Sequence, residues 1–218
     1  MRALVTGAGR GIGLAVCRHL AAAGFEVVAS ARHLADAEAA GTGRAVRLDV
    51  TDAGSVAAAL EQAGPVDILV NNAGVLLDAG APPESVPPEL VAETLAVNAL
   101  GALRVSQAVL PGMFDRGWGR IVMVSSGTGA FSHGLFTGAP AYALSKTALN
   151  AVTVLLANSA RGRGVLVNAV NPGRVRTRMM PEADGDPATA AADIAWAATL
   201  PDDGPTGTFF RSREPIDW

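Results

Sequence analysis

The sequence is nearly devoid of lysine and tyrosine. Among its 218 residues Lys146 is the only lysine and Tyr142 is the only tyrosine. Apart from the histidines, every other basic residue is an arginine. Cysteine is just as rare: Cys17 stands alone, which excludes a disulfide framework and a metal site built from several cysteines. We therefore expect neither a disulfide nor a metal ion in this chain.

Strong charge and long apolar runs are also missing. The net charge is −3 and the arginines are scattered, which argues against a nucleic acid or a membrane surface as partner. The stretch most similar to a membrane span, Ala141–Ala160, contains Lys146 and Asn150 among other polar residues, so it predicts a buried helix. A strand pattern begins at the N-terminus with no charged leader before it, which indicates a cytoplasmic protein.

The two rare residues lie four positions apart, in Tyr142-Ala-Leu-Ser-Lys146. Residues i and i+4 share one face of a helix, so the phenol and the ammonium would point into the same space. A free phenol has a pKa of about 10, and a neighbouring positive charge lowers that pKa toward the range useful for proton transfer. The alternative is a core tyrosine beside a surface lysine.

Short β-rich runs alternate with alanine-rich helical stretches, the pattern of a doubly wound α/β fold with a parallel sheet. No linker divides the chain, so residues 1–218 are expected to form a single domain. The expected strands are Ala3–Thr6, Glu26–Ser30, Ala45–Leu48, Ile68–Asn71, Arg120–Val124, Leu166–Val170 and Thr208–Arg211. The expected helices are Ile12–Ala23, Ser55–Gln62, Pro88–Leu110, Pro140–Ser159 and Pro187–Ala198.

A glycine-rich turn joins the first expected strand to the first expected helix. Glycines allow a tight turn there and let backbone N–H groups approach a pyrophosphate at the positive end of the helix. An ordinary strand–helix turn is the alternative. The residues expected at the pyrophosphate are Gly7, Arg10, Gly11, Ile12 and Gly13.

The end of the second expected strand bears on the choice between NAD and NADP. A site selective for NAD carries an acidic residue about 20 positions after the glycines, where it binds the ribose 2′-hydroxyl. Here Arg32 occupies that region, and its guanidinium, with Arg10, can bind a 2′-phosphate. NADP(H) is therefore favoured over NAD(H). Two alternatives stay open: Asp36 or Glu38 reaches back and supplies the acid of an NAD site, or both arginines are merely solvated surface residues.

Further short motifs follow along the chain in a fixed order. They are Thr6-Gly-Ala-Gly-Arg-Gly-Ile-Gly13, Asp49-Val50, Asn71-Asn72-Ala73-Gly74, Asn98, Ser125-Ser126, the Tyr142/Lys146 pair, and Asn171-Pro172-Gly173-Arg174-Val175-Arg176-Thr177. Together they resemble the short-chain dehydrogenase/reductase family, carbonyl-reductase-like members in particular, over nearly the whole chain. The resemblance implies that residues 1–218 form a single NAD(P)-binding Rossmann domain with an integrated active site.

The resemblance implies a catalytic set of Asn98, Ser126, Tyr142 and Lys146. Tyr142 would give a proton to a carbonyl oxygen or take one from an alcohol, and Ser126 would hydrogen-bond the same oxygen. Lys146 would bind the nicotinamide ribose and lower the phenol pKa, and Asn98 would hold a water that links Lys146 to solvent.

The resemblance also implies contacts along the cofactor. Asp49 would meet the adenine amino group and Val50 would support the ring, while the segment after the sixth strand would touch the carboxamide. The implied cofactor-binding residues beyond the glycine-rich turn and Arg32 are Asp49, Val50, Asn72, Ala73, Gly74, Tyr142, Lys146, Pro172, Gly173, Val175 and Thr177.

The chain departs from the family pattern between Ser126 and Tyr142, where the spacing is about three residues longer than usual. This leaves open which of Ser125 and Ser126 is catalytic, with Ser126 preferred. The extra length falls in Ala130–Pro140, whose Phe131, Leu135 and Phe136 either line an apolar substrate site or pack on the domain. We expect His133 to lie on this loop, near the mouth of the substrate pocket.

These observations predict an NADPH-dependent oxidoreductase that reduces a ketone or aldehyde of a small, fairly apolar molecule. Two rivals remain: a non-redox dehydration or isomerisation on the same scaffold, since a fold does not fix a function, and a cofactor-binding sensor without turnover. A homodimer is the expected assembly, because the long helices near 88–110 and 140–160 carry small residues on many faces.

Overall fold

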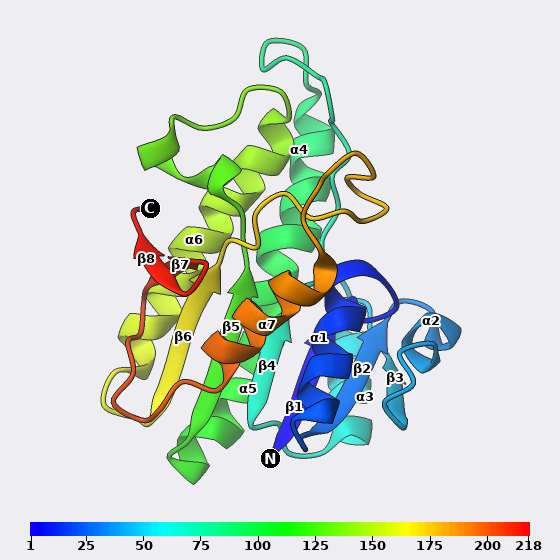
Figure 1. Ribbon diagram of the computed structural model, residues 1–218, viewed down its shortest axis with the longest axis vertical. Helices are drawn as coiled ribbons and strands as arrows, with labels where there is room; N and C mark the ends of the chain where they lie inside the picture. Colours follow the sequence, from blue (N-terminus) through cyan, green and yellow to red (C-terminus); the bar gives the residue numbers. More distant parts are fainter.

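The computed structural model describes residues 1–218, and one eight-stranded sheet forms its centre (Figure 1). The strand order is β3-β2-β1-β4-β5-β6-β7-β8; the first seven strands in the chain pair in parallel, and β8 is antiparallel to β7. The strands are β1 (Arg2–Thr6), β2 (Glu26–Ala31), β3 (Arg44–Arg47), β4 (Ile68–Asn71), β5 (Gly119–Val124), β6 (Val165–Val170), β7 (Phe209–Arg211) and β8 (Glu214–Ile216).

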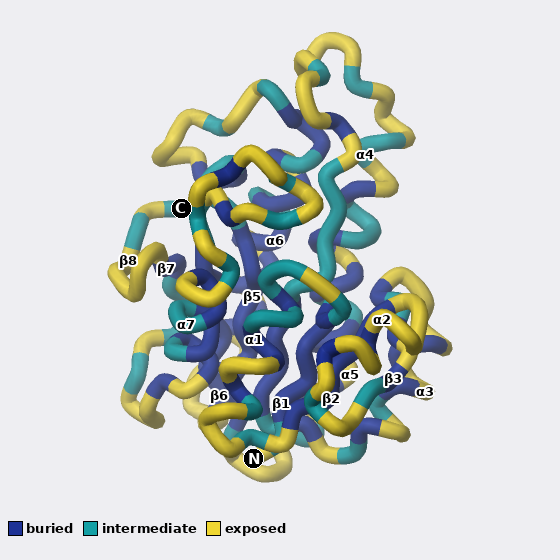
Figure 2. Tube along the Cα trace, turned by 45° about the vertical axis from the view of Figure 1, so that its right-hand side comes forward, coloured by how far each residue is buried: buried dark blue, intermediate teal, exposed yellow.

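Helices cover both faces of this sheet. They are α1 (Gly11–Ala22), α2 (Leu34–Glu38), α3 (Ala53–Ala63), α4 (Pro88–Leu95), α5 (Ala102–Arg116), α6 (Pro140–Ala160) and α7 (Pro187–Ala198). The central strands are mostly apolar because each side chain meets a helix on its own side, although Arg120 of β5 and Asn168 of β6 are also buried. Figure 2 shows the strands buried and the connecting loops largely exposed.

Two apolar cores result, one on each face of the sheet. On one face Leu4 and Leu69 pack with side chains of α3, α5 and α6. On the other, Val5 and Ile68 pack with side chains of α1 and α7. The single-domain, doubly wound α/β fold expected from the sequence is confirmed.

The order of the strands reverses between β1 and β4, which are neighbours although two strands separate them in the chain. In such sheets the loops that leave the two strands part in opposite directions and open a crevice at the carboxyl ends. The glycine-rich turn follows β1 and Asn71 ends β4, so both motifs lie at this edge.

The structure differs from the sequence-based expectation in three elements. The single helix expected over Pro88–Leu110 is interrupted by a π-helical turn, Ala96–Gly101, between α4 and α5. The short helix α2 was not expected. Neither was the β7–β8 hairpin, which turns through Ser212 and Arg213 at positive φ, where glycine or asparagine is the usual signal. No helix is long and apolar enough to cross a membrane.

Candidate active site

The glycine-rich turn after β1 is built by close backbone approach. Gly7 has a φ of +65°, and a side chain there would come within 2.9 Å of the Ala73 Cα atom. A side chain on Gly13 would overlap the Asn72 amide and the Gly7 carbonyl. The turn therefore requires glycine at both positions and leaves the start of α1 open on its outer side.

Asn72 ties this turn to the end of β4. Its side-chain amide donates to the carbonyl oxygens of Thr6 (2.9 Å) and Gly7 (3.0 Å). In return, the Thr6 hydroxyl accepts from the backbone N–H groups of Asn72 and Ala73, both at 3.0 Å. The two predicted cofactor segments, 7–13 and 72–74, thus form one rigid unit.

Two exposed arginines lie at the adenosine end of this edge. Neither Arg10 nor Arg32 takes part in an ion pair, so both guanidinium groups are available to an anion. However, α2 brings Asp36 back onto the turn, where the Asp36 carbonyl and Cβ atom would lie within 2.8 Å of a side chain on Gly9. The alternative that an acidic residue reaches back to the glycine-rich turn, as in an NAD site, is thus supported by the position of Asp36.

Asp49 and Val50 follow β3 beside these arginines. The Asp49 carboxyl accepts from the Thr51 hydroxyl (2.7 Å) and backbone N–H (2.9 Å), and these bonds, with the nearby charges of Arg32 and Arg47, lower its pKa. Val50 is buried, and it packs where Gly101 leaves room for it.

The segment after β6 closes over the glycine-rich turn. Gly173, at a φ of +75°, donates its N–H to the Asn171 side chain (2.9 Å) just beyond Pro172. Val175 is buried, and the Thr177 methyl group lies next to Gly11, 3.2 Å from where a side chain would begin. Of the expected cofactor residues, this brings Pro172–Thr177 to the same crevice as the turn.

Ser126 and Tyr142 meet at the carboxyl end of β5. The Ser126 hydroxyl lies close enough to the phenol of half-buried Tyr142 to oppose the rise in its pKa. Ser126 Oγ accepts from the Thr128 backbone N–H (3.2 Å) and hydroxyl (3.0 Å), so its own O–H is the group that points its proton toward the phenol side of the site.

Ser125 points the other way. It is buried, and its hydroxyl donates to the Asn150 side chain of α6 at 2.5 Å. The structure thus separates the two serines into one that faces the phenol and one that fastens β5 to α6.

Lys146 lies one helical turn after Tyr142 on α6. Its ammonium is buried, stands 5.4 Å from the centre of the Tyr142 ring and makes one hydrogen bond, to the Val124 carbonyl oxygen (2.8 Å). An ammonium has three donors, so two are left for a ligand. Burial lowers the pKa of Lys146 to about 8.

The pKa of Tyr142 differs from the sequence-based expectation. Burial of the phenol raises its pKa to about 12, and the hydrogen bond with Ser126 opposes that rise only in part. The Lys146 ammonium, engaged with Val124, does not overcome the desolvation. At neutral pH the side chain is therefore a protonated phenol.

Asn98 lies in the π-helical turn and is buried. Its side-chain amide accepts from the Val75 N–H (2.8 Å) and donates to the Val75 carbonyl and the Ser145 hydroxyl (both 2.9 Å). Both N–H donors are thus used, and a water on this side chain would have only the remaining acceptor lone pair. π-Turns are frequent at functional sites because they place one side chain out of helical register.

The long loop between Ser126 and Tyr142 enters the core only at its ends, where Ala130 and Ala139 are buried. Phe131 is 69% exposed and Phe136 is 55% exposed, so these two rings do not pack against the body of the domain, whereas Leu135 is half-buried. His133 lies beside Gly127, with its Nδ1 atom 3.2 Å from where a side chain would begin.

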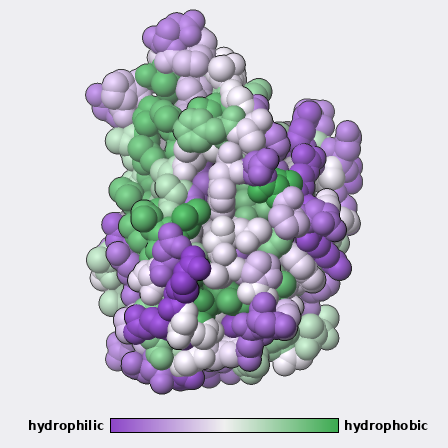
Figure 3. Space-filling model, turned by 90° about the vertical axis from the view of Figure 1, so that its left-hand side faces the viewer, coloured by the Kyte–Doolittle hydropathy of each residue, from purple (hydrophilic) through white to green (hydrophobic).

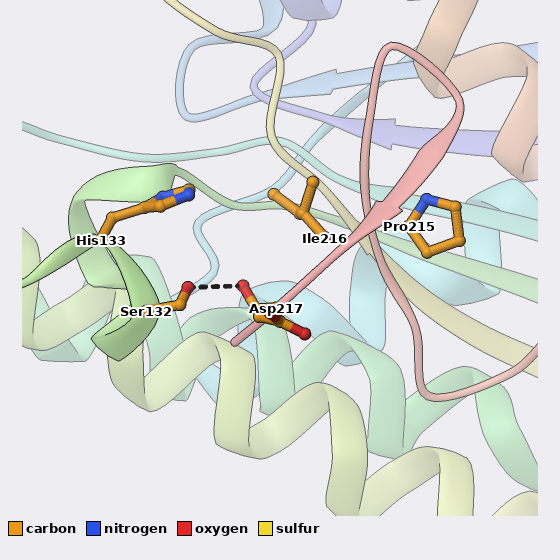
Figure 4. Close-up of a pocket in the computed structure, with 5 residues that line it drawn as sticks. All are labelled: Ser132, His133, Pro215, Ile216 and Asp217. Carbon is orange, nitrogen blue, oxygen red and sulfur yellow. Dashed lines mark hydrogen bonds between the residues drawn. The ribbon is translucent and has the colours of Figure 1, made fainter.

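The same loop meets the C-terminal hairpin around an open cavity of about 450 Å³, lined by Ser132, His133, Pro215, Ile216 and Asp217 (Figure 4). The Ser132 hydroxyl donates to the Asp217 carbonyl oxygen at 3.0 Å, and Trp218 stacks on Phe209. These contacts fasten the loop to the C-terminal end of the chain.

Two residues near Tyr142 were missed from the sequence. Asp78 is buried and binds the start of α6, and Ser145 connects Asn98 to the Tyr142 backbone. No local signal marks Asp78: Ala139-Pro140 offers no capping side chain, but α1 and α4 also begin without one, so the sequence did not reveal a distant partner.

The crevice fits a dinucleotide. A cradle that admits only glycine faces the start of α1, two arginines without ion pairs stand at one end, and a buried ammonium with two free donors stands at the other. A cofactor of this kind supplies a hydride, and the protein orients it and handles the proton.

Comparison with known proteins agrees with this reading. The family described as short chain dehydrogenase matches residues 1–187, and the chain belongs to that family of oxidoreductases, which act on CH–OH and C=O groups.

Two relatives and one solved structure illustrate the similarity. The chain is 36% identical to "3-oxoacyl-[acyl-carrier-protein] reductase FabG" of Escherichia coli (strain K12) over 81% of its own length and 74% of that protein. It is 38% identical to L-xylulose reductase of Bos taurus, over 99% and 86%. The structure superposes on a 3-ketoacyl-(acyl-carrier-protein) reductase from Brucella melitensis complexed with NADH, with a TM-score of 0.87, 28% identity and coverage of 96% and 95%.

Proposed function

We propose that this protein is an NADPH-dependent reductase that converts a ketone or aldehyde of a small, fairly apolar molecule to an alcohol. The observation that carries the proposal is the placement of Tyr142: its phenol lies beside the Ser126 hydroxyl, and the Lys146 ammonium stands 5.4 Å from the centre of its ring. The names of both curated relatives above describe reductases, which supports the direction of the reaction.

In this proposal Tyr142 is the proton donor. Its hydroxyl gives a proton to the substrate oxygen as that oxygen gains negative charge. The O–H of Ser126, which faces the phenol, donates to the same oxygen and stabilises the charge. Lys146 binds the nicotinamide ribose with its two remaining donors and brings a positive charge near the phenolate left behind.

Asn98 supports this arrangement rather than reacting. Its amide fixes Val75, at the end of the expected ribose-binding segment Asn72–Gly74, against α6 through Ser145. A water that carries protons from Lys146 to solvent would use the acceptor lone pair that Asn98 still has.

The preference for NADPH is proposed from the arginines. Arg32 follows β2 directly, and a guanidinium without an ion pair there suits a 2′-phosphate. Asp36, packed against Gly9, is the residue that would instead favour NADH by accepting from a ribose hydroxyl.

A homodimer is proposed for the assembly. Leu144 and Leu155 of α6 are 50% and 67% exposed, and their separation of eleven positions, about three turns, places them on one face of the helix. Figure 3, which views the side with the C-terminal hairpin, shows other hydrophobic patches separated by hydrophilic ones. The mass of the protein in solution, with and without Leu155→Glu, tests this: a shift from dimer to monomer is expected.

The proposed function is tested by following NADPH and NADH consumption with purified protein over a panel of ketones, aldehydes and diketones. Turnover of an apolar carbonyl compound with a clear preference for NADPH is expected. Formation of product without consumption of either cofactor would instead indicate the non-redox alternative.

A further inference from the structure

The helix that carries Tyr142 and Lys146 begins without a cap of its own. Ala139 precedes α6 and offers no side-chain hydrogen bond, and Pro140 occupies the first helical turn. The first N–H groups of a helix have no partner within the helix, so they need one from elsewhere. Tyr142 lies within this first turn, where an uncapped helix would fray.

Asp78 supplies the missing cap from a distant segment. Its Oδ2 atom accepts a hydrogen bond of 2.5 Å from the Ala141 N–H, across 63 positions of the chain. Asp78 is only 3% exposed, and an acidic group is favourable at the positive end of a helix. Nearby, the Gly80 N–H donates to the Gly138 carbonyl at 2.8 Å, so the segment is fastened to the start of α6 twice.

The same segment also reaches the other side of Tyr142. The Val75 backbone is bound in both directions by the Asn98 amide, and Asn98 donates to the Ser145 hydroxyl. The Ser145 hydroxyl in turn donates to the Tyr142 carbonyl oxygen at 2.7 Å. Residues 75–80 therefore hold the chain on both sides of Tyr142: directly at the Pro140–Ala141 peptide group, one residue before it, and through Asn98 and Ser145 at the peptide group that follows it.

We propose that Asp78 and Ser145 are positioning residues that fix the Tyr142 phenol against Ser126. This inference rests on the proposed function, in which Tyr142 donates the proton. Proton transfer requires hydrogen-bond distance to the reacting oxygen, and a misplacement of about 1 Å can cost on the order of 100-fold in rate. Neither residue is assigned a contact with the substrate; both act through the backbone of Tyr142.

The Asp78 Oδ1 atom strengthens the assignment. It is buried and has no hydrogen-bond partner, so this carboxyl group is kept in the interior with only half of its acceptors satisfied by the protein. A buried polar atom without a partner costs stability, and a purely structural cap does not need that cost because exposed caps such as Asp186 on α7 avoid it.

The test is a set of double-mutant cycles with Tyr142→Phe. Asp78→Ala and Ser145→Ala are each made in the wild-type and in the Tyr142→Phe background, and single-turnover reduction rates are measured at saturating NADPH. In the wild-type background each change should lower the rate at least tenfold, with the KM for NADPH within about twofold. In the Tyr142→Phe background neither should lower the residual rate further, because residues that act as a unit are not additive.

Two controls separate positioning from stability. Asp78→Asn keeps an acceptor oxygen for the Ala141 N–H and should retain at least a third of the wild-type rate. Asp186→Ala removes a cap from α7 by the same chemical change and should leave the rate within about twofold. If Asp78→Ala does not fold, Asp78→Asn and Ser145→Ala still test the positioning role, since both keep the side chain close to its original size.

The outcomes distinguish this inference from the function on which it rests. Rates within twofold of wild type for both Asp78→Ala and Ser145→Ala, beside a strong loss in Tyr142→Phe, overturn the positioning role alone. An equal loss in both backgrounds also overturns it, because that result reports general damage. Wild-type turnover by Tyr142→Phe would overturn the proposed proton donor and the positioning role together.

Discussion

The Lys146 ammonium stands 5.4 Å from the centre of the Tyr142 ring and donates its hydrogen bond to the Val124 carbonyl oxygen rather than to the phenol. Burial shifts the two side chains in opposite senses: it raises the pKa of Tyr142 to about 12 and lowers the pKa of Lys146 to about 8. Without cofactor the site therefore holds a firmly protonated acid beside a lysine that titrates close to the working range.

NADPH binding should weaken as the pH rises through about 8. The ammonium of Lys146 is present below its pKa and lost above it, and the neutral amine attracts an anionic cofactor less. A fluorescence titration of NADPH from pH 6.5 to 9.5 measures this, with Lys146→Met as the control that should bind weakly and show no such inflection. A dissociation constant that stays flat over this range would contradict the assignment of Lys146 to the ribose.

Tyr142→Phe should abolish turnover while leaving the cofactor site intact. Loss of a positioned general acid costs about 100- to 10,000-fold, whereas the phenyl ring keeps the packing of α6. The rate of reduction and the dissociation constant of NADPH, measured on the same preparation, check this. The dissociation constant should change by less than about threefold, and a larger change would mean that the phenol is needed for binding instead.

Ser126→Ala should reduce catalysis, whereas Ser125→Ala should reduce stability. Ser126→Ala removes a donor to the substrate oxygen and should lower kcat by about 100-fold or more without a change in melting temperature. Ser125→Ala breaks a buried hydrogen bond to Asn150, which costs about 1–2 kcal/mol and lowers the melting temperature by about 2–8 °C. Thermal unfolding and kcat for both variants form a matched pair, and the reverse pattern would reassign the two serines.

Cofactor preference should respond to Arg32 and to Asp36 in opposite directions. Arg32→Asp removes the guanidinium proposed for the 2′-phosphate and should shift the ratio of kcat/KM for NADPH over NADH at least tenfold toward NADH. Asp36→Asn removes the acid beside Gly9 and should leave NADPH use intact while weakening any use of NADH. If Arg32→Asp leaves the ratio unchanged, Arg32 is a solvated surface residue.

Much of the fold was predictable because its strands are apolar and its glycines stand where only glycine fits. β1, β4 and β6 were expected to within one or two residues, since each is a short buried run between turn residues. The β7–β8 hairpin was missed because Ser212 and Arg213 occupy positive φ, a conformation that their side chains do not signal.

The sequence predicted which residues form the site, but not the hydrogen bonds that hold them in place. Tyr142, Lys146 and Ser126 are marked by composition and motif, whereas the π-turn at Asn98 arises from how α4 and α5 pack and has no local signal. Asp78 acts across 63 positions, so its role became visible only once the chain was folded. The prediction that the pKa of Tyr142 is lowered was wrong for the same reason. The spacing of Tyr142 and Lys146 shows that a charge is near, whereas the burial that raises this pKa depends on the tertiary structure.

The transfer of deuterium from NADPH labelled at both hydrogens of the nicotinamide C4 atom tests the central claim most directly. With a ketone that turns over, mass spectrometry of the alcohol should find one deuterium on the carbon that bore the oxygen, and the label should appear at least 100-fold more slowly with Tyr142→Phe. Product that forms without deuterium would contradict hydride transfer and leave a dehydration or isomerisation as the reaction of this site.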